Sequence, residues 1–125
     1  MAEVTVTRTV SAPLEEVWAR IGTFSDPSWL PGVTLKEMQG QTRILSVRPS
    51  ATIRETLVDS ADHSLTWLTE ETPLPIRDYR VTLAVTAVDA GTEVSWHATF
   101  TPTVQAEGQA EAMMRDMVKD MLSAV

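Results

Sequence analysis

The chain has 125 residues, a length that fits one domain, 1–125, able to bury a core without disulfides or bound metals. The absence of cysteine excludes disulfides, thiolate metal sites and cysteine nucleophiles, and the net charge of -7 argues against binding to nucleic-acid phosphates. No apolar run approaches the about 20 residues that span a bilayer, and no signal-peptide pattern opens the sequence, so we expect a cytoplasmic protein without stable membrane insertion.

A strand and a helix are predicted at the start of the chain. Valines alternate with threonines over residues 4–10, and this period of two is typical of a half-buried strand. Residues 11–22, SAPLEEVWARIG, have an early Pro, two glutamates near the start and a terminal Gly, which together predict a short helix. Its inward face is expected to carry Val17, Trp18 and Ile21.

The next stretch, TFSDPSWLPGV (residues 23–33), is predicted to contain a second short helix. Pro27 and Pro31 exclude one continuous helix through this stretch but allow a single turn. Two interpretations are open. The apolar side chains of this stretch plug the core, or the stretch forms a stiff flap that gates a cavity between hinges at Gly22 and Gly32.

The remainder of the chain is predicted to form an antiparallel meander of about six strands and a long C-terminal helix. Short runs rich in β-branched residues are separated by turn signals near Gly40, Pro49, Asp59, Pro73 and Gly91. From residue 105 onward, apolar residues recur at three- and four-residue steps opposite charged ones. Because only this helix can cover the apolar face of the sheet, we expect an α+β fold in which a curved sheet grips the helix.

Seven fragments carry a family resemblance. In chain order they are SAPLEEVW, DPSWLPGV, Arg43, IRETLVD, LTW, PLPIRDYRVTL and TEVSWHATFTP. Together they resemble the motifs of the polyketide cyclase/dehydrase and lipid-transport family in the START-like SRPBCC superfamily, over nearly the whole chain. Two departures stand out: the hairpin before Arg43 lacks a Gly pair, and His97 replaces a small polar residue.

This resemblance implies a helix-grip fold, with about seven antiparallel strands wrapped around the C-terminal helix and two short helices after the first strand. It also implies an apolar cavity between the sheet and the last helix. Family members bind hydrophobic small molecules, and some are cyclases, aromatases or dehydratases of polyketide intermediates. The resemblance brings no shared catalytic set, because fold transfers between relatives more reliably than function.

Strand alternation predicts a carboxylate on the apolar, inward face of the sheet. Glu55 shares its face with Ile53 and Leu57. A buried Glu must be paired, hydrogen-bonded or protonated, and Arg43 and Tyr79 are the suitable inward partners. Either Glu55 is a general acid or base, with Arg43 or Tyr79 polarising a carbonyl as aldol cyclisation and dehydration require, or Glu55 and Arg43 form a structural ion pair.

Apolar and aromatic side chains on the inward faces are candidates for ligand contact. Alternation and helical spacing favour core packing for all of them, but methionines adapt to irregular ligands and aromatic rings stack on flat ones. The predicted contact residues are Trp29, Trp67, Leu83, Trp96, Phe100, Met113, Met114 and Met117.

No metal site or Ser-His-Asp triad is predicted. His63 falls in a turn, and His97 falls on the outer face by alternation, whereas either kind of site needs an inward His with oriented partners. We therefore expect no cofactor.

The leading functional hypothesis is a protein that binds an aromatic or polyketide-like ligand in an internal cavity, with a cofactor-free cyclase or dehydratase as the favoured form. The alternative is a non-catalytic carrier or sensor with the same pocket. A third hypothesis is a partner-binding module with an acidic surface and a solid interior. As to assembly, a monomer or a homodimer is expected.

Overall fold

A computed structural model describes residues 1–47 and 50–125 and shows seven strands and two helices. All neighbouring strands are antiparallel, in the order β1-β7-β6-β5-β4-β3-β2. The elements are β1 (Ala2–Val10), α1 (Leu14–Ile21), β2 (Val33–Gln39), β3 (Thr42–Val47), β4 (Ala51–Ala61), β5 (Ser64–Glu71), β6 (Ile76–Val88), β7 (Gly91–Pro102) and α2 (Glu107–Leu122). The predicted α+β class is confirmed.

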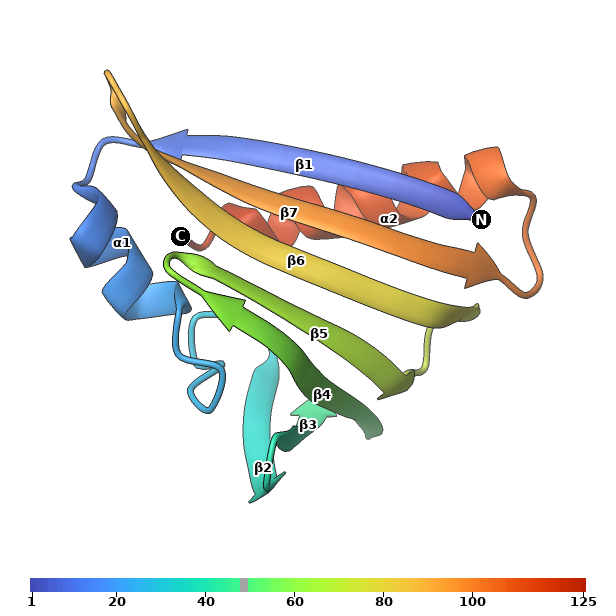
Figure 1. The fold of residues 1–125 in the computed structure, drawn as a ribbon. Coiled ribbons are helices and arrows are strands. Elements are labelled where there is room, and N and C mark those ends of the chain that lie inside the picture. Colours follow the sequence, from blue (N-terminus) through green and yellow to red (C-terminus); the bar gives the residue numbers. More distant parts are fainter. Residues whose placement is uncertain (48–49) are drawn as a thin grey trace.

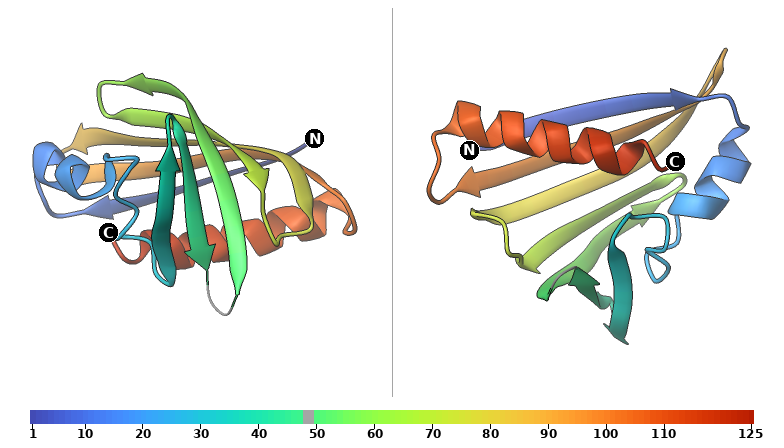
Figure 2. Two further views of the ribbon diagram at one scale, coloured as in Figure 1. Left: turned by 90° about the horizontal axis from the view of Figure 1, so that it is seen from below. Right: turned by 180° about the vertical axis from the view of Figure 1, so that it is seen from behind.

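The sheet bends around α2 (Figure 1). The helix lies along the concave side of β1 and β7, and the strands β2 to β4 turn away from it at the other end of the sheet (Figure 2). This is the predicted helix-grip arrangement.

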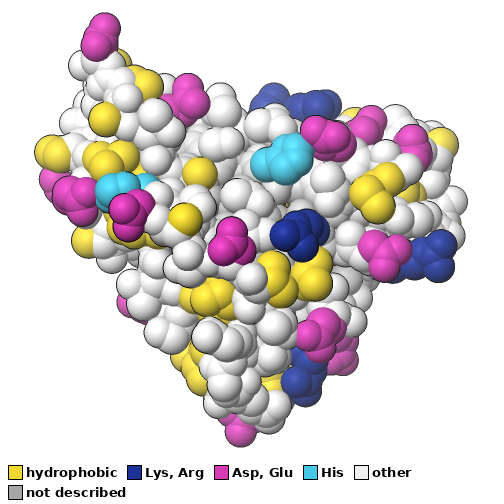
Figure 3. Space-filling view, in the orientation of Figure 1, with side chains coloured by type: hydrophobic (Ala, Val, Ile, Leu, Met, Phe, Trp, Pro, Cys, Tyr) yellow, Lys and Arg dark blue, Asp and Glu magenta, His cyan; other side chains and the backbone are white. Residues whose placement is uncertain are grey.

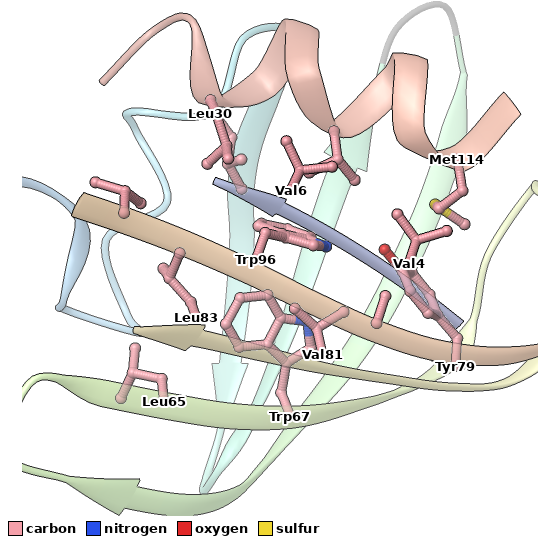
Figure 4. Close-up of a cluster of buried hydrophobic side chains, with 14 of the residues drawn as sticks. Val4, Val6, Leu30, Leu65, Trp67, Tyr79, Val81, Leu83, Trp96 and Met114 are labelled. Atoms are coloured by element: carbon pink, nitrogen blue, oxygen red, sulfur yellow. The ribbon is translucent and has the colours of Figure 1, made fainter. Parts of the chain in front are cut away.

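Alternating side chains give the sheet one apolar face. On β7 every second residue from Thr92 to Phe100 is buried, and the same alternation holds on β6 from Tyr79 to Val85. The close-up in Figure 4 shows the resulting cluster of valine, leucine and aromatic side chains between the strands and α2. The inward faces predicted by alternation are therefore correct on both strands.

The second short helix predicted after α1 does not form. Two turns replace it, in which the Asp26 amide donates to the Thr23 carbonyl at 3.0 Å and the Leu30 amide donates to the Pro27 carbonyl at 2.9 Å. The physical reason is that the proline nitrogens cannot donate, so no continuous ladder of hydrogen bonds can build up. The turn predicted near Pro49 lies partly outside the described residues.

The sheet buries only part of the apolar face that the sequence predicts for α2. Met114 is fully buried, whereas Met113, Met117 and Met121 are half-buried on the flank of the helix. Apolar residues form two neighbouring rows on this helix, each with a spacing of four residues. The sheet contacts the row that has the smaller side chains. That row consists of Ala110, Met114, Val118 and Leu122.

On the outer face of the sheet, acidic, basic and apolar side chains are scattered rather than gathered into one patch (Figure 3). His97 lies on this face, as expected, where its Nδ1 is 2.8 Å from the Thr5 hydroxyl. Neither helix in the described part of the chain is long and apolar enough to cross a bilayer.

Candidate functional site

A row of polar side chains crosses the concave face of the sheet at right angles to the strands. The cross-strand register pairs Arg43 of β3 with Glu55 of β4, Glu55 with Thr69 of β5, and Thr69 with Tyr79 of β6. Directly opposed residues on one face lie within contact distance of each other, so four consecutive strands build this row. Residues far apart in the sequence are thereby brought together, including the three predicted catalytic ones.

Arg43 and Glu55 form a buried ion pair. Arg43 is 3% exposed and Glu55 is 8% exposed. The Arg43 Nε donates to Glu55 Oε1 at 2.8 Å, and the Arg43 Nη2 lies 2.7 Å from the same oxygen. Two buried opposite charges at this distance stabilise each other only because each is also hydrogen-bonded by its surroundings.

Aromatic rings and a backbone carbonyl hold the Arg43 guanidinium. Its central carbon lies 4.1 Å from the centre of the Phe24 ring and 4.9 Å from that of Trp67, and its Nη1 donates to the Phe24 carbonyl at 2.9 Å. Burial lowers the pKa of Arg43, and the Glu55 charge partly opposes this shift. The turn after α1 thus supplies a cation-π contact and an acceptor that strand alternation alone could not reveal.

The Glu55 carboxylate has no acceptor capacity left. Besides the two Arg43 contacts on Oε1, the Trp67 indole donates to Oε2 at 3.1 Å and the Thr69 hydroxyl donates to it at 3.3 Å. A carboxylate offers about four acceptor positions, and all four are occupied. The ion pair is therefore fully hydrogen-bonded, and both interpretations of these residues, catalytic and structural, stay predictions.

Tyr79 is positioned by an irregularity in β6. The register shifts between Arg77 and Arg80, and Asp78 adopts a left-handed backbone conformation with φ 52°. This bulge inserts one extra exposed residue, so that Ile76 and Tyr79 both face inward although they are three positions apart. Burial first, and the Glu55 charge second, raise the pKa of Tyr79 well above its ordinary value of 10, so its hydroxyl stays protonated.

Trp96 of β7 lies next to Tyr79. Figure 4 shows the nitrogen-bearing edge of its indole turned toward the tyrosine. The indole N–H is close enough to favour the phenolate form slightly, which opposes the rise in the Tyr79 pKa, but it makes no hydrogen bond of normal geometry within the described residues. Trp96 therefore contributes an unused donor to this end of the row.

These residues form part of the wall of a cavity of about 260 Å³. The cavity lies between the strands β3 to β7, the flank of α2 and the residues that lead into β2. Apart from the polar row, its wall is predominantly apolar. The lining residues are Leu30, Pro31, Val33, Arg43, Leu45, Val47, Ile53, Glu55, Thr69, Thr72, Pro73, Leu74, Tyr79, Trp96, Met117 and Met121.

The structure places some of the predicted site residues on this wall and not others. Arg43, Glu55 and Tyr79, the predicted catalytic residues, all line the cavity, together with Trp96 and Met117 from the predicted contact set. Contact with a ligand stays a prediction for each of them.

The remaining predicted contact residues are not part of the wall. Protein side chains cover four of them in the core, whereas Trp29 and Met113 are half-buried. Phe100 and Met114 are 0% exposed in the core, and Trp67 packs between Phe24 and Trp96 beneath Arg43. The full set away from the wall is Trp29, Trp67, Leu83, Phe100, Met113 and Met114.

Sequence reasoning missed the wall residues contributed by irregular segments. Leu30 and Pro31 precede β2, Val33 is its first residue, and residues 72–74 lie between β5 and β6, where no periodic pattern indicates direction. Strand alternation does indicate Leu45 and Ile53, because Leu45 lies on the same face of β3 as Arg43 and Ile53 lies on the same face of β4 as Glu55. The stretch 23–33 therefore contributes to the cavity wall, and its position at a mouth and any movement as a flap stay predictions.

Neither histidine contributes to the cavity wall. The His63 Nε2 lies 2.7 Å from the Glu15 Oε1 of α1. The His63 and Trp18 rings pack in a T-shaped arrangement with their centres 5.8 Å apart, and Trp18 is half-buried. Within the described residues, no group of three or more histidine and acidic side chains could hold a metal ion.

Comparison with known proteins identifies one family. A family model described as polyketide cyclase / dehydrase and lipid transport matches residues 1–125. No curated protein matches the chain.

Solved structures share the fold. A protein of Bacillus thuringiensis has 29% identity and a TM-score of 0.91, with 98% of this chain and 95% of that one covered. The XoxI protein of Bacillus cereus has 29% identity and a TM-score of 0.91, with 99% and 92% covered. A further neighbour is StfQ, a di-domain ARO/CYC protein of the steffimycin biosynthetic pathway, with 11% identity, a TM-score of 0.72 and coverage of 98% and 48%.

Proposed function

Because the chain belongs to the polyketide cyclase/dehydrase and lipid-transport family, we propose that it binds a small hydrophobic molecule between the sheet and α2. The observation that carries this proposal is the cavity of about 260 Å³ with its predominantly apolar wall. Drug-sized ligands occupy pockets of about 300–1,000 Å³, so the ligand is smaller, of the size of one or two fused rings. Burial of its apolar surface supplies the binding free energy.

Binding without catalysis fits the polar row better than catalysis does. A general base needs an acceptor oxygen within reach of the substrate proton, but both Glu55 oxygens already accept two contacts each. In a carrier or sensor, the same ion pair keeps the strands β3 and β4 in register at the cavity wall. We therefore place the carrier or sensor first.

The second candidate function is a cofactor-free cyclase or dehydratase. One observation favours it: the cavity wall contains Arg43, Glu55 and Tyr79 together. In a dehydration, a base would remove a proton next to a ketone and the neighbouring hydroxyl would leave as water. StfQ, a structural neighbour, is an ARO/CYC protein, but at 11% identity it supports the fold alone.

Calorimetric titration with tetralin, a two-ring hydrocarbon, tests the binding proposal. We expect saturable binding with a negative heat-capacity change, the mark of apolar burial. The variant Ile53→Trp fills the cavity from β4 and should abolish binding, whereas Ser46→Trp, on an exposed position of the neighbouring strand, should not. Absence of binding to the unmodified protein, or equal binding by both variants, would contradict the proposal.

Dehydration of a β-hydroxytetralone to α-naphthol and water separates the two candidates. A carrier should not accelerate this reaction above the rate in buffer, and naphthol fluorescence reports the product directly. Acceleration that is lost in Glu55→Gln, while tetralin binding is retained, would establish the enzyme instead.

A further inference from the structure

We propose that the ligand of this cavity presents a carbonyl oxygen to the hydroxyl of Tyr79 and the indole N–H of Trp96. This inference rests on the proposed binding function and specifies the chemical class of the ligand. It assigns the two residues as a donor pair that selects ketones over hydrocarbons of the same shape. The argument is a count of donors and acceptors at the Tyr79 end of the polar row.

Trp96 provides the first unmatched donor. Its side chain is 3% exposed, and its Nε1 atom is buried with no hydrogen-bond partner in the described part of the chain. An indole nitrogen can only donate, so no rotation of its hydrogen turns it into an acceptor. Nearly all buried donors in folded proteins are paired, and an exception calls for an explanation.

Tyr79 cannot supply all the acceptors that the two side chains need. If the Tyr79 oxygen accepts from the Trp96 indole, the Tyr79 hydroxyl proton still needs an acceptor. If the Tyr79 oxygen does not accept, the indole proton and the hydroxyl proton both lack an acceptor. The hydroxyl does not ionise to relieve the shortage, because burial and the nearby Glu55 charge raise the pKa of Tyr79. In either arrangement, at least one of the two protons of the pair has no acceptor within the pair.

Within the described residues, no hydrogen bond joins Tyr79 or Trp96 to the rest of the polar row. Both Glu55 oxygens are filled, one by Arg43 and the other by Trp67 and Thr69. The Thr69 hydroxyl, the nearest neighbour of Tyr79 in the register, donates its proton to Glu55 and keeps lone pairs that could accept, but no hydrogen bond joins it to Tyr79 in the part of the chain that the structure describes. A ligand oxygen is the group that completes this end of the cavity.

The chemical class of the ligand follows from the unmatched donors of Tyr79 and Trp96. A carbonyl oxygen has two lone pairs and no proton, so it can accept from both donors at once. A hydrocarbon leaves the donors unmatched, and an ammonium group adds donors where acceptors are lacking. Sites built around hydrogen bonds to a ligand discriminate against analogues that lack the bonding group, because their own buried groups are then left unpaired.

Affinities for α-tetralone and tetralin test the inference, since the two probes share a bicyclic skeleton and differ by the ketone oxygen. One neutral hydrogen bond contributes about fivefold in affinity, so two donors predict that α-tetralone binds about 5- to 30-fold tighter than tetralin. Tyr79→Phe keeps the ring and removes the hydroxyl. It should weaken α-tetralone binding by about fivefold and leave tetralin binding unchanged.

The unmodified protein gives an independent readout for Trp96. The sequence contains four tryptophans, so four indole N–H signals are expected in a nitrogen-15 NMR spectrum. After assignment, the Trp96 proton should shift downfield when α-tetralone binds and should not when tetralin binds. This measurement does not depend on the folding of any variant.

The outcomes separate the two proposals. If neither probe binds, the binding proposal fails. If both bind with equal affinity, the cavity is a ligand site and the inference about the carbonyl is wrong. Selectivity for α-tetralone that survives Tyr79→Phe, or an unmoved Trp96 signal, overturns the assignment of this donor pair.

Discussion

Replacing Glu55 by Gln is expected to destabilise the fold strongly, although the change replaces only one oxygen by an NH₂ group. Arg43 is 3% exposed, so its charge would be left in the core without a partner. Breaking a buried ion pair by removing one member costs about 3–5 kcal/mol. We expect this range for the loss in the free energy of unfolding at neutral pH.

The contacts of Glu55 explain why Gln is a poor substitute. If the Gln oxygen accepts from Arg43, its NH₂ group faces the Trp67 indole, and two donors then oppose each other. If the side chain flips, the NH₂ group faces the Arg43 cation instead. One buried donor stays unmatched in either orientation, a cost of about 1–3 kcal/mol that forms part of the total.

A double-mutant cycle distinguishes a paired charge from general sensitivity of the site. Arg43→Met alone should cost about as much as Glu55→Gln, because it leaves a buried carboxylate and an unmatched Phe24 carbonyl. The double variant Arg43→Met/Glu55→Leu should lose far less than the sum of the single variants Arg43→Met and Glu55→Leu, since hydrophobic replacement of a whole buried pair is often neutral.

Equilibrium unfolding in urea measures these free energies. Glu71→Gln, at an exposed position on β5, is the matched control and should change stability by less than about 0.5 kcal/mol. A loss below about 1 kcal/mol in Glu55→Gln, or strict additivity in the cycle, would refute the assignment of a structural ion pair.

Three further predictions concern the single tyrosine, the last helix and the hairpin between β6 and β7. Because the pKa of Tyr79 is raised in the folded state, its contribution to stability is intact below pH 10 and falls as the pH rises above 10; tyrosinate absorption should appear only on unfolding. Met114→Ala should cost about 2–5 kcal/mol, whereas Met117→Ala should cost less and enlarge the cavity, so that bulkier bicyclic probes bind. Gly91→Ala should destabilise severely, because a Cβ atom would overlap the Val10 carbonyl and φ is 137°.

Each of these predictions has a clear contrary result. Tyrosinate absorption at about pH 10 in the folded protein would show that Tyr79 is open to solvent. Equal stability losses in the two methionine variants would show that the flank of α2 is core rather than cavity wall. For the hairpin, Gly32→Ala is the control, since its φ is also positive but its added Cβ meets no atom within 4 Å. An equal loss in both glycine variants would contradict the role of the Val10 contact.

Local periodicity in the sequence was sufficient for the order of the elements and for the faces of the strands. A strand exposes alternate residues to opposite sides whatever its neighbours are, so the inward positions of Arg43, Glu55 and Tyr79 could be read before any pairing was known. The same argument placed His97 outside. The prediction of a second short helix was wrong, because Pro27 and Pro31 lack the N–H groups that helical hydrogen bonds need, and turns form instead.

Tertiary structure alone decided which inward residues line the cavity and which form the core. Periodicity gives a direction, but the distance from a strand to α2 depends on how the sheet bends, so Trp96 reaches the cavity and Phe100 on the same strand does not. The filled carboxylate of Glu55 likewise depends on register, which brings Trp67 and Thr69 from the next strand. Such contacts join residues distant in the chain, and only the folded arrangement sets their distances.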